Sequence, residues 1–450
     1  MPARTLLLAG ALCACRLAAA EALLPVIVDD AGLQAVVERA RSEFLAQQDF
    51  DRLQVTVLVE DRTGRWLRGA VEGSRLAYPA SCAKLAFLVG AVHWCAGQGH
   101  APDCLDEFVR PMIHESDNVS TGIVVDKITG APNAALAGTD AEAWLARRSY
   151  TERVLERAGL LDDQRLLTKT YPSNSGDEPA GLEKFALERH GRNAMSADGA
   201  ARLMLAIASG AIEPQATRYM RSLLRRPTFS EQGSLGGGLP AGSLHENKIG
   251  NAYDTLEDVI YAELPNGRRL VIAAFSNGWN QSEDQPWDVA RLGRFTELVI
   301  AGLGLDRGLE PARYLSAVEL PEAGRTGGWE RGRSRGSFSS AGHLASDGQP
   351  GTAVSWTLDA ASAGRYEIAV WYPATAAATA SAQFEVEHAG GHTTVILDQR
   401  NWGSRWIRLG DFELSQDGGK VRLTARSPGQ LVADTLRVRA WPQQAGHRGR

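Results

Sequence analysis

Apolar residues in the N-terminal two thirds of the chain recur with two periods, one typical of helices and one typical of strands. Residues 29–48 carry apolar side chains at helical spacing, which predicts an amphipathic helix. Alternating apolar residues over 53–59 and 65–71, and again over 258–264 and 270–276, predict two β-hairpins, because turn-forming residues separate the two members of each pair.

The order of these elements predicts how they are layered. Helical patterns occupy much of the region between the two hairpins, including 197–211 and 213–225, and a last helix is predicted over 285–303. Helix, hairpin, helices, hairpin and helix together predict an α/β fold, namely an αβα sandwich in which helices cover both faces of an antiparallel sheet.

The C-terminal third has a different texture. Residues 304–351 are rich in Gly, Arg, Ser and Pro, and short alternating segments follow at 352–358, 364–372, 382–388, 392–397, 406–409, 420–425 and 434–438. Many short strands separated by turn residues predict an all-β sandwich.

The length of 450 residues allows at least two hydrophobic cores, because a single core stops growing at about 250–300 residues. We therefore predict a multidomain protein. Its expected parts are a signal peptide over 1–20, an α/β domain over 21–303, a linker over 304–335, a β-sandwich over 336–442 and a tail over 443–450.

The N-terminal residues predict export. Arg4 precedes an apolar stretch over 5–15, and small residues follow as far as Ala20. This order is typical of a cleaved signal peptide, and the apolar stretch is too short to span a bilayer. We expect a periplasmic or secreted protein without a transmembrane segment. Leu12-Cys13-Ala14-Cys15 resembles a lipoprotein cleavage box, but Arg16 directly after it disfavours lipidation.

The net charge bears on the partners of the protein, and its cysteines and histidines bear on disulfides and metal binding. A net charge of -5 and a pI near 6.0 do not favour nucleic acid or an anionic membrane. In an oxidising compartment Cys95 and Cys104 could close the short loop between them and leave Cys82 unpaired, although three reduced thiols are the alternative. Nine scattered histidines and the lack of a Cys-x-x-Cys pair give no support for a metal site.

One apolar helical stretch, PASCAKLAFLVG over 79–90, contains a serine and a lysine. Ser81 and Lys84 are three positions apart, so a helix places them on one face. A desolvated lysine can lose its proton and then activate a serine hydroxyl. The chain has six lysines and 42 arginines, and only lysine can serve where an amine must give up its proton. The spacing alone also occurs by chance.

Two further stretches carry suitable side chains. Ser116-Asp117-Asn118 begins a predicted helix that runs to Thr129, where a serine could relay a proton and an amide could hold a carbonyl; a plain helix cap is the alternative. Lys248-Ile249-Gly250 leads into the second hairpin, where glycine allows a ligand to approach the backbone; a surface lysine is the alternative.

The three stretches in this order resemble the S-x-x-K, S-D-N and K-T-G motifs of the penicillin-recognising serine enzymes, class A β-lactamases in particular, over residues 29–303. The resemblance implies a β-lactamase/transpeptidase-like fold and a role for each matched residue. The implied roles are Ser81 as acylated nucleophile, Lys84 as its base, Ser116 as proton shuttle, Asn118, Lys248 and Gly250 as substrate-binding residues, and the backbone amides of Ser81 and Asn251 as an oxyanion hole.

The chain departs from this family at two places. Ile249 stands where the family has a hydroxyl that binds the substrate carboxylate. The E-x-x-x-N pattern, which serves the deacylating water in class A β-lactamases, is not found over 150–193. Glu178 and Glu183 are candidate substitutes for the glutamate, and without one acylation would proceed while hydrolysis would be slow.

The C-terminal segments resemble golvesin C-terminal-like domains, which accompany secreted enzymes and are expected to attach to glycans or surfaces. Trp371, Trp402 and Trp406 are candidates for stacking on sugar rings, and a place in the core is the alternative for each.

Together these features predict an exported serine hydrolase that forms an acyl-enzyme at Ser81. The resemblance implies β-lactams or D-alanyl peptides of the cell wall as substrates, without a metal or organic cofactor. A contrasting hypothesis is a non-catalytic surface or glycan-binding protein whose β-lactamase-like domain is degenerate.

Overall fold

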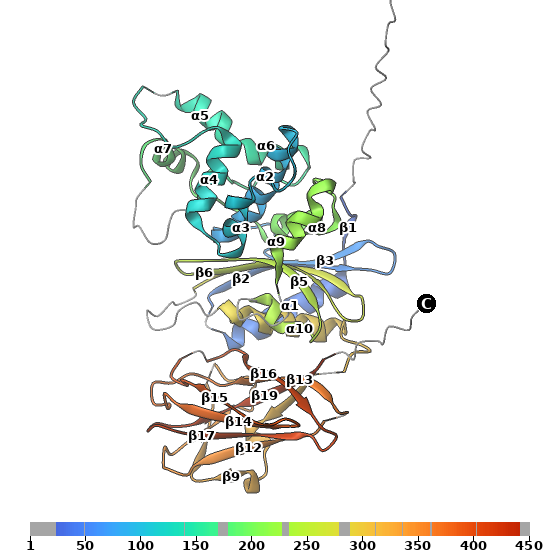
Figure 1. The fold of residues 1–450 in the computed structure, drawn as a ribbon, viewed down its shortest axis with the longest axis vertical. Coiled ribbons are helices and arrows are strands. Elements are labelled where there is room, and N and C mark those ends of the chain that lie inside the picture. The colour runs from blue at the N-terminus through green and yellow to red at the C-terminus, as the bar shows by residue number, and fades with distance from the viewer. Residues whose placement is uncertain are drawn as a thin grey trace, which may run out of the picture.

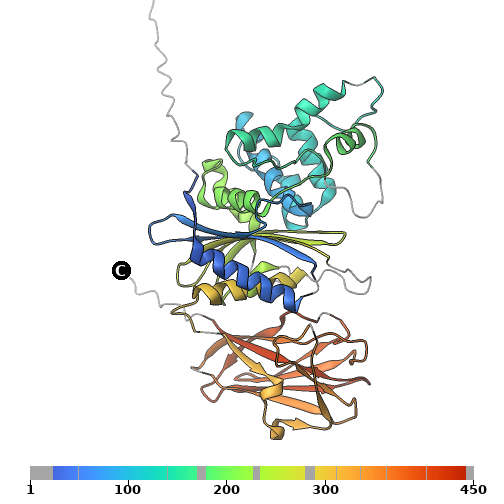
Figure 2. The same cartoon turned by 180° about the vertical axis from the view of Figure 1, so that it is seen from behind.

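The structure is a computed structural model that describes residues 24–441 except for 49, 139, 170–178, 227–233, 279–288, 311, 335, 361 and 402. The described residues form stacked layers (Figure 1). A helical layer lies on one face of a seven-stranded sheet, and α1 (Ala31–Gln47) and α10 (Gly293–Leu303) lie on the other face. The C-terminal sheets pack beyond α1 and α10 (Figure 2). The signal peptide and the tail predicted from the sequence lie outside the described residues.

The seven-stranded sheet has the order β1-β3-β2-β7-β6-β5-β4. Its strands are β1 (Ile27–Asp29), β2 (Arg52–Glu60), β3 (Trp66–Val71), β4 (Arg225–Arg226), β5 (Leu244–Ala252), β6 (Thr255–Glu263) and β7 (Arg269–Asn277). β1 pairs with β3 in parallel, and the other neighbours are antiparallel. Both predicted hairpins and the αβα arrangement are therefore confirmed. The short β4 pairs with His245 and Glu246 of β5.

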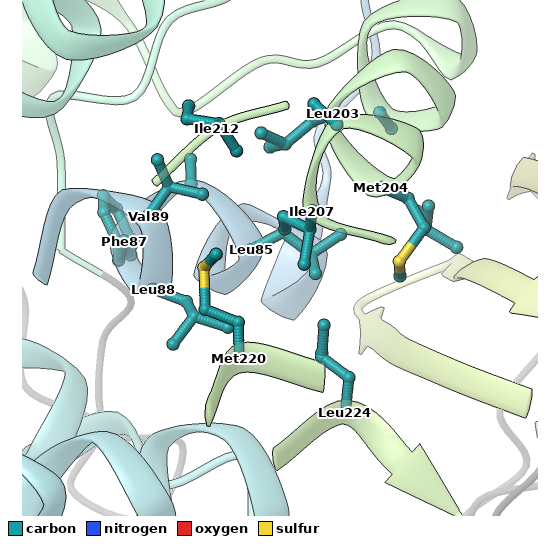
Figure 3. Packing of buried hydrophobic residues seen from close by; sticks show 14 of the residues in the cluster. Leu85, Phe87, Leu88, Val89, Leu203, Met204, Ile207, Ile212, Met220 and Leu224 are labelled. Atoms are coloured by element: carbon teal, nitrogen blue, oxygen red, sulfur yellow. The ribbon is translucent and has the colours of Figure 1, made fainter. Parts of the chain in front are cut away.

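Helices on the two sheet faces bury separate cores. α1 (Ala31–Gln47) and α10 (Gly293–Leu303) cover one face, with Phe44 and Phe295 in edge-to-face contact. The other face carries α2 (Lys84–Gly97), α3 (Asp106–His114), α4 (Asn118–Thr129), α5 (Ala141–Arg148), α6 (Tyr150–Arg157), α7 (Gly181–His190), α8 (Ala197–Ser209) and α9 (Thr217–Leu224). Figure 3 shows side chains of α2, α8 and α9 packed together in this second core.

Helix α2 is the central helix of the helical layer. By length and composition the stretch Ala80–Gly97 could cross a membrane, whereas no segment with that length and composition was expected from the sequence. In this fold 72% of the stretch is buried inside the protein. Its apolar residues therefore form core contacts, as expected for the central helix of a globular domain.

The C-terminal residues form three antiparallel sheets around one core. Their strands are β8 (Arg313–Ser316), β9 (Arg325–Thr326), β10 (Trp329–Gly332), β11 (His343–Ser346), β12 (Ala353–Leu358), β13 (Gly364–Trp371), β14 (Ala382–His388), β15 (Gly391–Leu397), β16 (Ile407–Leu414), β17 (Gly419–Ala425), β18 (Val432–Ala433) and β19 (Thr435–Ala440). The predicted all-β architecture is confirmed.

The segment 304–335 differs from the expected linker. It contributes β8, β9 and β10, which pair with β19, β12 and β11 of the C-terminal sheets. Strands of two to four residues are too short to show an alternating pattern in a Gly- and Arg-rich segment, so composition hid them.

Candidate active site

Ser81 lies on a short 3-10 turn, η1 (Ala80–Ala83), which passes directly into α2. Ala80, the residue before the serine, has a φ of 42°, a left-handed conformation that is uncommon for a residue with a side chain. Such strain costs about 1–3 kcal/mol and persists where the surroundings impose it, often at functional sites. The turn therefore presents Ser81 at the start of a helix that is buried almost throughout.

Ser116 and Asn118 come from the connection between α3 and α4. Ser116 has a φ of 58°, which is also left-handed. Asp117 caps α4, because its side chain accepts a hydrogen bond from the backbone N–H of Ser120. The helix-cap interpretation of Ser-Asp-Asn thus holds for Asp117, while its two neighbours face Lys84.

The Lys84 amine is surrounded by four oxygens. Its Nζ lies 3.1 Å from Ser81 Oγ, 3.1 Å from Ser116 Oγ, 2.8 Å from Asn118 Oδ1 and 2.5 Å from the Ser116 carbonyl oxygen. An ammonium has three N–H donors, whereas a neutral amine has two donors and a lone pair that can accept from a hydroxyl. The shell fits a neutral amine that donates to the carbonyl and amide oxygens and accepts from a serine.

Burial and charge both favour that neutral state. Lys84 is 0% exposed, and burial, followed by the positive charge of Lys248, lowers the pKa of Lys84 to about 6. Among the described residues no carboxylate lies within ion-pair distance of Lys84. An amine with this pKa can take a proton from a hydroxyl at neutral pH.

Lys248 contacts the Ser116 hydroxyl from the side of the sheet. It lies on β5, and its Nζ is 3.0 Å from Ser116 Oγ and 2.8 Å from the Ile249 carbonyl oxygen. The Cys82 thiol donates to the Lys248 carbonyl oxygen, which links η1 to β5. Lys248 is 2% exposed, which rules out the surface-lysine alternative. Ile249 packs instead with the apolar cluster of α1 and α10, so no hydroxyl is present at its position.

Gly250 allows β5 to lie against the nucleophile turn. A Cβ at this position would be 2.7 Å from the Pro79 carbonyl oxygen and 3.1 Å from the Cys82 backbone nitrogen. Any side chain would therefore push β5 away from η1. Asn251 follows on the same strand, beyond Gly250.

A buried acid that was not expected from the sequence lies beside this turn. Glu257 on β6 is paired in register with Gly250 and is fully buried, and neither carboxyl oxygen has a hydrogen-bond partner among the described residues. Burial raises the pKa of Glu257 well above its usual value, which favours the neutral carboxyl. Two adjacent acidic residues, Glu257 and Asp258, at the start of an apolar strand pattern are the signal that could have drawn attention to it.

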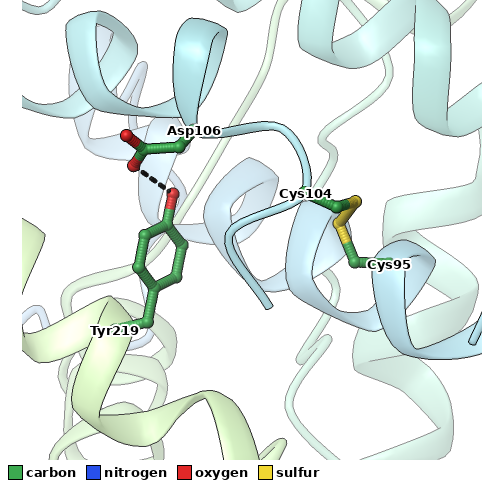
Figure 4. Close-up of a disulfide and its surroundings, with 4 residues drawn as sticks. All are labelled: Cys95, Cys104, Asp106 and Tyr219. Atoms are coloured by element: carbon green, nitrogen blue, oxygen red, sulfur yellow. Dashed lines mark hydrogen bonds between the residues drawn. A yellow bond between two sulfur atoms is a disulfide. The ribbon is translucent and has the colours of Figure 1, made fainter. Parts of the chain in front are cut away.

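A disulfide ties together the two helices that lead to Lys84 and Ser116. It joins Cys95, near the end of α2, to Cys104, just before α3 (Figure 4), while Cys82 is buried and free. The Tyr219 hydroxyl on α9 donates to Asp106 at the start of α3 (Figure 4). These contacts fix α3, whose C-terminal end precedes Ser116.

The proposed deacylating glutamates are not brought to Ser81 by any described contact. Glu183 on α7 is buried and forms ion pairs with Arg148 and Lys169. Thr168, before α7 in the chain, and Asn193, after α7, are joined by three hydrogen bonds. Glu178 lies outside the described residues. Glu183 thus takes part in an ion-pair cluster, and no described carboxylate hydrogen bonds to Ser81 or Lys84.

The tryptophans proposed for sugar stacking have other contacts. Trp371 is 2% exposed, and Trp406 packs against Trp371, Phe338 and Tyr314. The Trp406 indole N–H also donates to Glu297 of α10. Both rings therefore belong to the interior and to the contact with the α/β domain, whereas Trp402 lies outside the described residues.

Comparisons with known families match both halves of the chain. The model of the β-lactamase enzyme family matches residues 104–296, and that of the golvesin C-terminal domain matches residues 317–440. Golvesin of Dictyostelium discoideum is 30% identical over 437 residues, which cover 94% of this chain and 75% of that protein. Xanthan lyase of Bacillus sp. is 32% identical over 120 residues, 25% of this chain and 13% of that protein.

Solved structures also resemble part of the chain. An acyl-enzyme complex of a PBP-A variant with penicillin G is 17% identical, with a TM-score of 0.45, and covers 63% of this chain and 100% of its own. A β-lactamase from Sphaerobacter thermophilus is 17% identical, with a TM-score of 0.43, over 62% of this chain and 99% of its own.

Proposed function

Because this chain belongs to the golvesin family and joins a β-lactamase-type domain to a golvesin C-terminal domain, we propose that it is a serine hydrolase that forms an acyl-enzyme at Ser81. The observation that carries the proposal is the position of the Lys84 amine, 3.1 Å from Ser81 Oγ and 3.1 Å from Ser116 Oγ in a buried setting that favours the neutral amine. A degenerate domain would have no need to keep a lysine in this costly environment.

The proposed acylation uses these groups in order. Lys84 takes the proton of the Ser81 hydroxyl as Ser81 Oγ forms a bond to the substrate carbonyl carbon. The carbon–nitrogen bond of the amide then breaks, and the proton passes from Lys84 through the Ser116 hydroxyl to the leaving nitrogen. The backbone amides of Ser81 and Asn251 would hold the oxyanion, and Asn118 would bind the substrate.

The proposed substrates are β-lactams or related D-alanyl peptides of the cell wall. Lys248 would supply positive charge near an anionic substrate, but Ile249 offers no hydroxyl to a carboxylate. We therefore expect weaker dependence on a substrate carboxylate than a Thr or Ser at position 249 would give.

The ester bond would be hydrolysed slowly. Water must attack the acyl carbon to release the acid and restore the Ser81 hydroxyl, and this water needs a base. No described carboxylate hydrogen bonds to Ser81 or Lys84, and Glu183 is engaged by Arg148 and Lys169. Unless Glu178 supplies this base, the adduct is expected to persist, as in a penicillin-binding protein.

The proposed place of action is outside the cytosol, in the periplasm or in the medium. The disulfide between Cys95 and Cys104 supports an oxidising compartment. The signal peptide proposed over 1–20 would deliver the protein there.

Incubation with a fluorescent penicillin, followed by intact-mass measurement, tests the proposal. The wild type should gain one penicillin mass and keep it, and Ser81→Ala should gain none. Rapid hydrolysis without an adduct would contradict only the proposed slow hydrolysis of the acyl-enzyme, not the proposed acylation. An absence of adduct and of hydrolysis in the wild type would contradict the proposed reaction with β-lactams and favour a binding role for the protein.

A further inference from the structure

A buried ionic cluster joins the C-terminal domain to the α/β domain. Arg437 and Arg439 on β19 project from the sheet face opposite to Leu436 and Val438, which lie in the sandwich core. Glu297 of α10 pairs with Arg437, and Glu367 of β13 pairs with both arginines, at 3.1 Å and 2.7 Å. These four charged side chains are at most 6% exposed, so solvent screens them little.

The same two arginines bind the main chain of the segment that leads into β5. Arg437 donates to the carbonyl oxygen of Gly237 at 3.4 Å, and Arg439 donates to the carbonyl oxygen of Leu239. Gly237 belongs to the 3-10 turn η3 (Leu235–Gly238), and β5 begins a few residues later. The C-terminal domain thus holds the chain just before the strand that carries Lys248.

The η3 segment is held from two other directions. Gly238 packs so closely on α10 that an added Cβ would lie 1.9 Å from the carbonyl oxygen of Gly293. Asp258 on β6 accepts from the Leu235 backbone N–H at 2.9 Å and from the Asn247 amide at 3.1 Å. α10, β6 and β19 therefore clamp the entry to β5.

We propose that Arg437 and Arg439 are positioning residues, through which the C-terminal domain sets the place of Lys248 relative to Ser116. This inference rests on the proposed function, because it concerns the geometry of the Ser81 site. Lys248 Nζ and Lys84 Nζ lie 3.0 Å and 3.1 Å from Ser116 Oγ, so a small shift of β5 would break one of these contacts.

The test compares three variants of the full-length chain. Arg439→Gln removes the charge and the reach to Leu239, Arg439→Lys keeps the charge beside Glu367, and Arg400→Gln is the control because Arg400 pairs with Asp398 within one loop. The rate of Ser81 acylation by fluorescent penicillin should fall about 10- to 100-fold in Arg439→Gln. It should be partly restored in Arg439→Lys and unchanged in Arg400→Gln.

The pH dependence separates positioning from a loss of stability. The charge of Lys248 helps to keep the pKa of Lys84 low, after the larger effect of burial. If β5 moves, this charge moves away and the acid limb of the acylation rate should shift to higher pH in Arg439→Gln. A variant that is only less stable would lose active protein without moving the limb.

A wild-type rate and limb in Arg439→Gln would overturn the inference. Should that variant fail to fold, Arg437→Gln takes its place, and a wild-type rate and limb in Arg437→Gln have the same meaning. If the wild type itself is not acylated, the proposed function fails. Hydrogen–deuterium exchange over residues 244–252 then tests whether Arg439 holds β5 in place. Faster exchange in Arg439→Gln than in Arg400→Gln would support it, and equal exchange would overturn it.

Discussion

The cations at the domain interface and at the Ser81 site are buried to a similar degree but have opposite surroundings. Arg437 is 3% exposed and faces the carboxylates of Glu297 and Glu367, whereas Lys84 is 0% exposed and contacts neutral oxygens. A second lysine, Lys248, adds positive charge near Lys84.

The difference between these regions separates a structural use of charge from a chemical one. A guanidinium keeps its proton at any working pH, so a buried arginine needs carboxylates, and the resulting pairs fix geometry. An amine without such a partner gives up its proton more easily. The choice of lysine in a chain dominated by arginine therefore identifies the position where a proton has to move.

Lys84→Arg gives the largest expected effect, because it replaces an amine that can lose its proton with a guanidinium that keeps it. A guanidinium at this position cannot accept the Ser81 proton, so the acylation rate should fall about 10²- to 10⁴-fold, as in Lys84→Met. The rate is measured by intact mass after reaction with a penicillin. Lys184→Arg is the control, since Lys184 is 61% exposed. Wild-type acylation by Lys84→Arg would show that Lys84 is not the base.

Glu367→Gln tests the paired cluster in the complementary way. Loss of this carboxylate leaves Arg437 and Arg439 with too little negative charge, and breaking a buried pair costs about 3–5 kcal/mol. The unfolding midpoint in denaturant should fall accordingly. Asp398→Asn removes a more exposed pair with Arg400 and should change the free energy of unfolding by less than about 1 kcal/mol. Equal effects of the two substitutions on the unfolding midpoint would contradict a structural role for the buried ion pairs at the domain interface.

Gly250→Ala tests how closely the site must be packed. The added Cβ would meet the Pro79 carbonyl oxygen at 2.7 Å and displace β5 from η1. Overpacking of this kind costs about 1–3 kcal/mol, so acylation should slow by about 10-fold. Gly97→Ala is the matched control, because no atom lies within 4 Å of its added Cβ. If both variants react at the wild-type rate, the close approach of β5 has no part in acylation.

Glu257→Gln has the smallest expected effect and concerns a buried carboxyl group instead of a buried cation. The folded pKa of Glu257 is raised by burial, so its neutral form is favourable below the unfolded pKa of about 4.5 and stability is lost as pH rises toward the folded value. Glutamine cannot ionise. The variant should match the wild type near pH 4.5 and exceed it in unfolding midpoint at pH 8. Parallel midpoints across this range would contradict a neutral Glu257.

The local part of the site could be predicted from sequence. Ser81 and Lys84 share one helical turn, so their spacing alone places them together. The contact of Lys248 with Ser116 spans 132 positions, and only the resemblance to a family with ordered motifs could predict it. The place of Glu257 beside Gly250 required the fold, because it depends on how β6 pairs with β5.

The interface between the domains was not predictable from local patterns. The alternation of β19 correctly indicates that Arg437 and Arg439 point away from the sandwich core. An outward charged face is usually solvated, however, and nothing in the strand shows that α10 and η3 cover it. The expected linker failed for a similar reason, since its strands are defined by partners far along the chain.

The central claim is that a neutral Lys84 activates Ser81, and the pH dependence of Ser81 acylation tests it most directly. The rate of adduct formation, measured by intact mass from pH 4 to pH 10, should rise through an acid limb near pH 6 and then level off, because Lys84 must lose its proton and its pKa is about 6. A rate that rises only near pH 10, where an ordinary lysine loses its proton, would contradict the account.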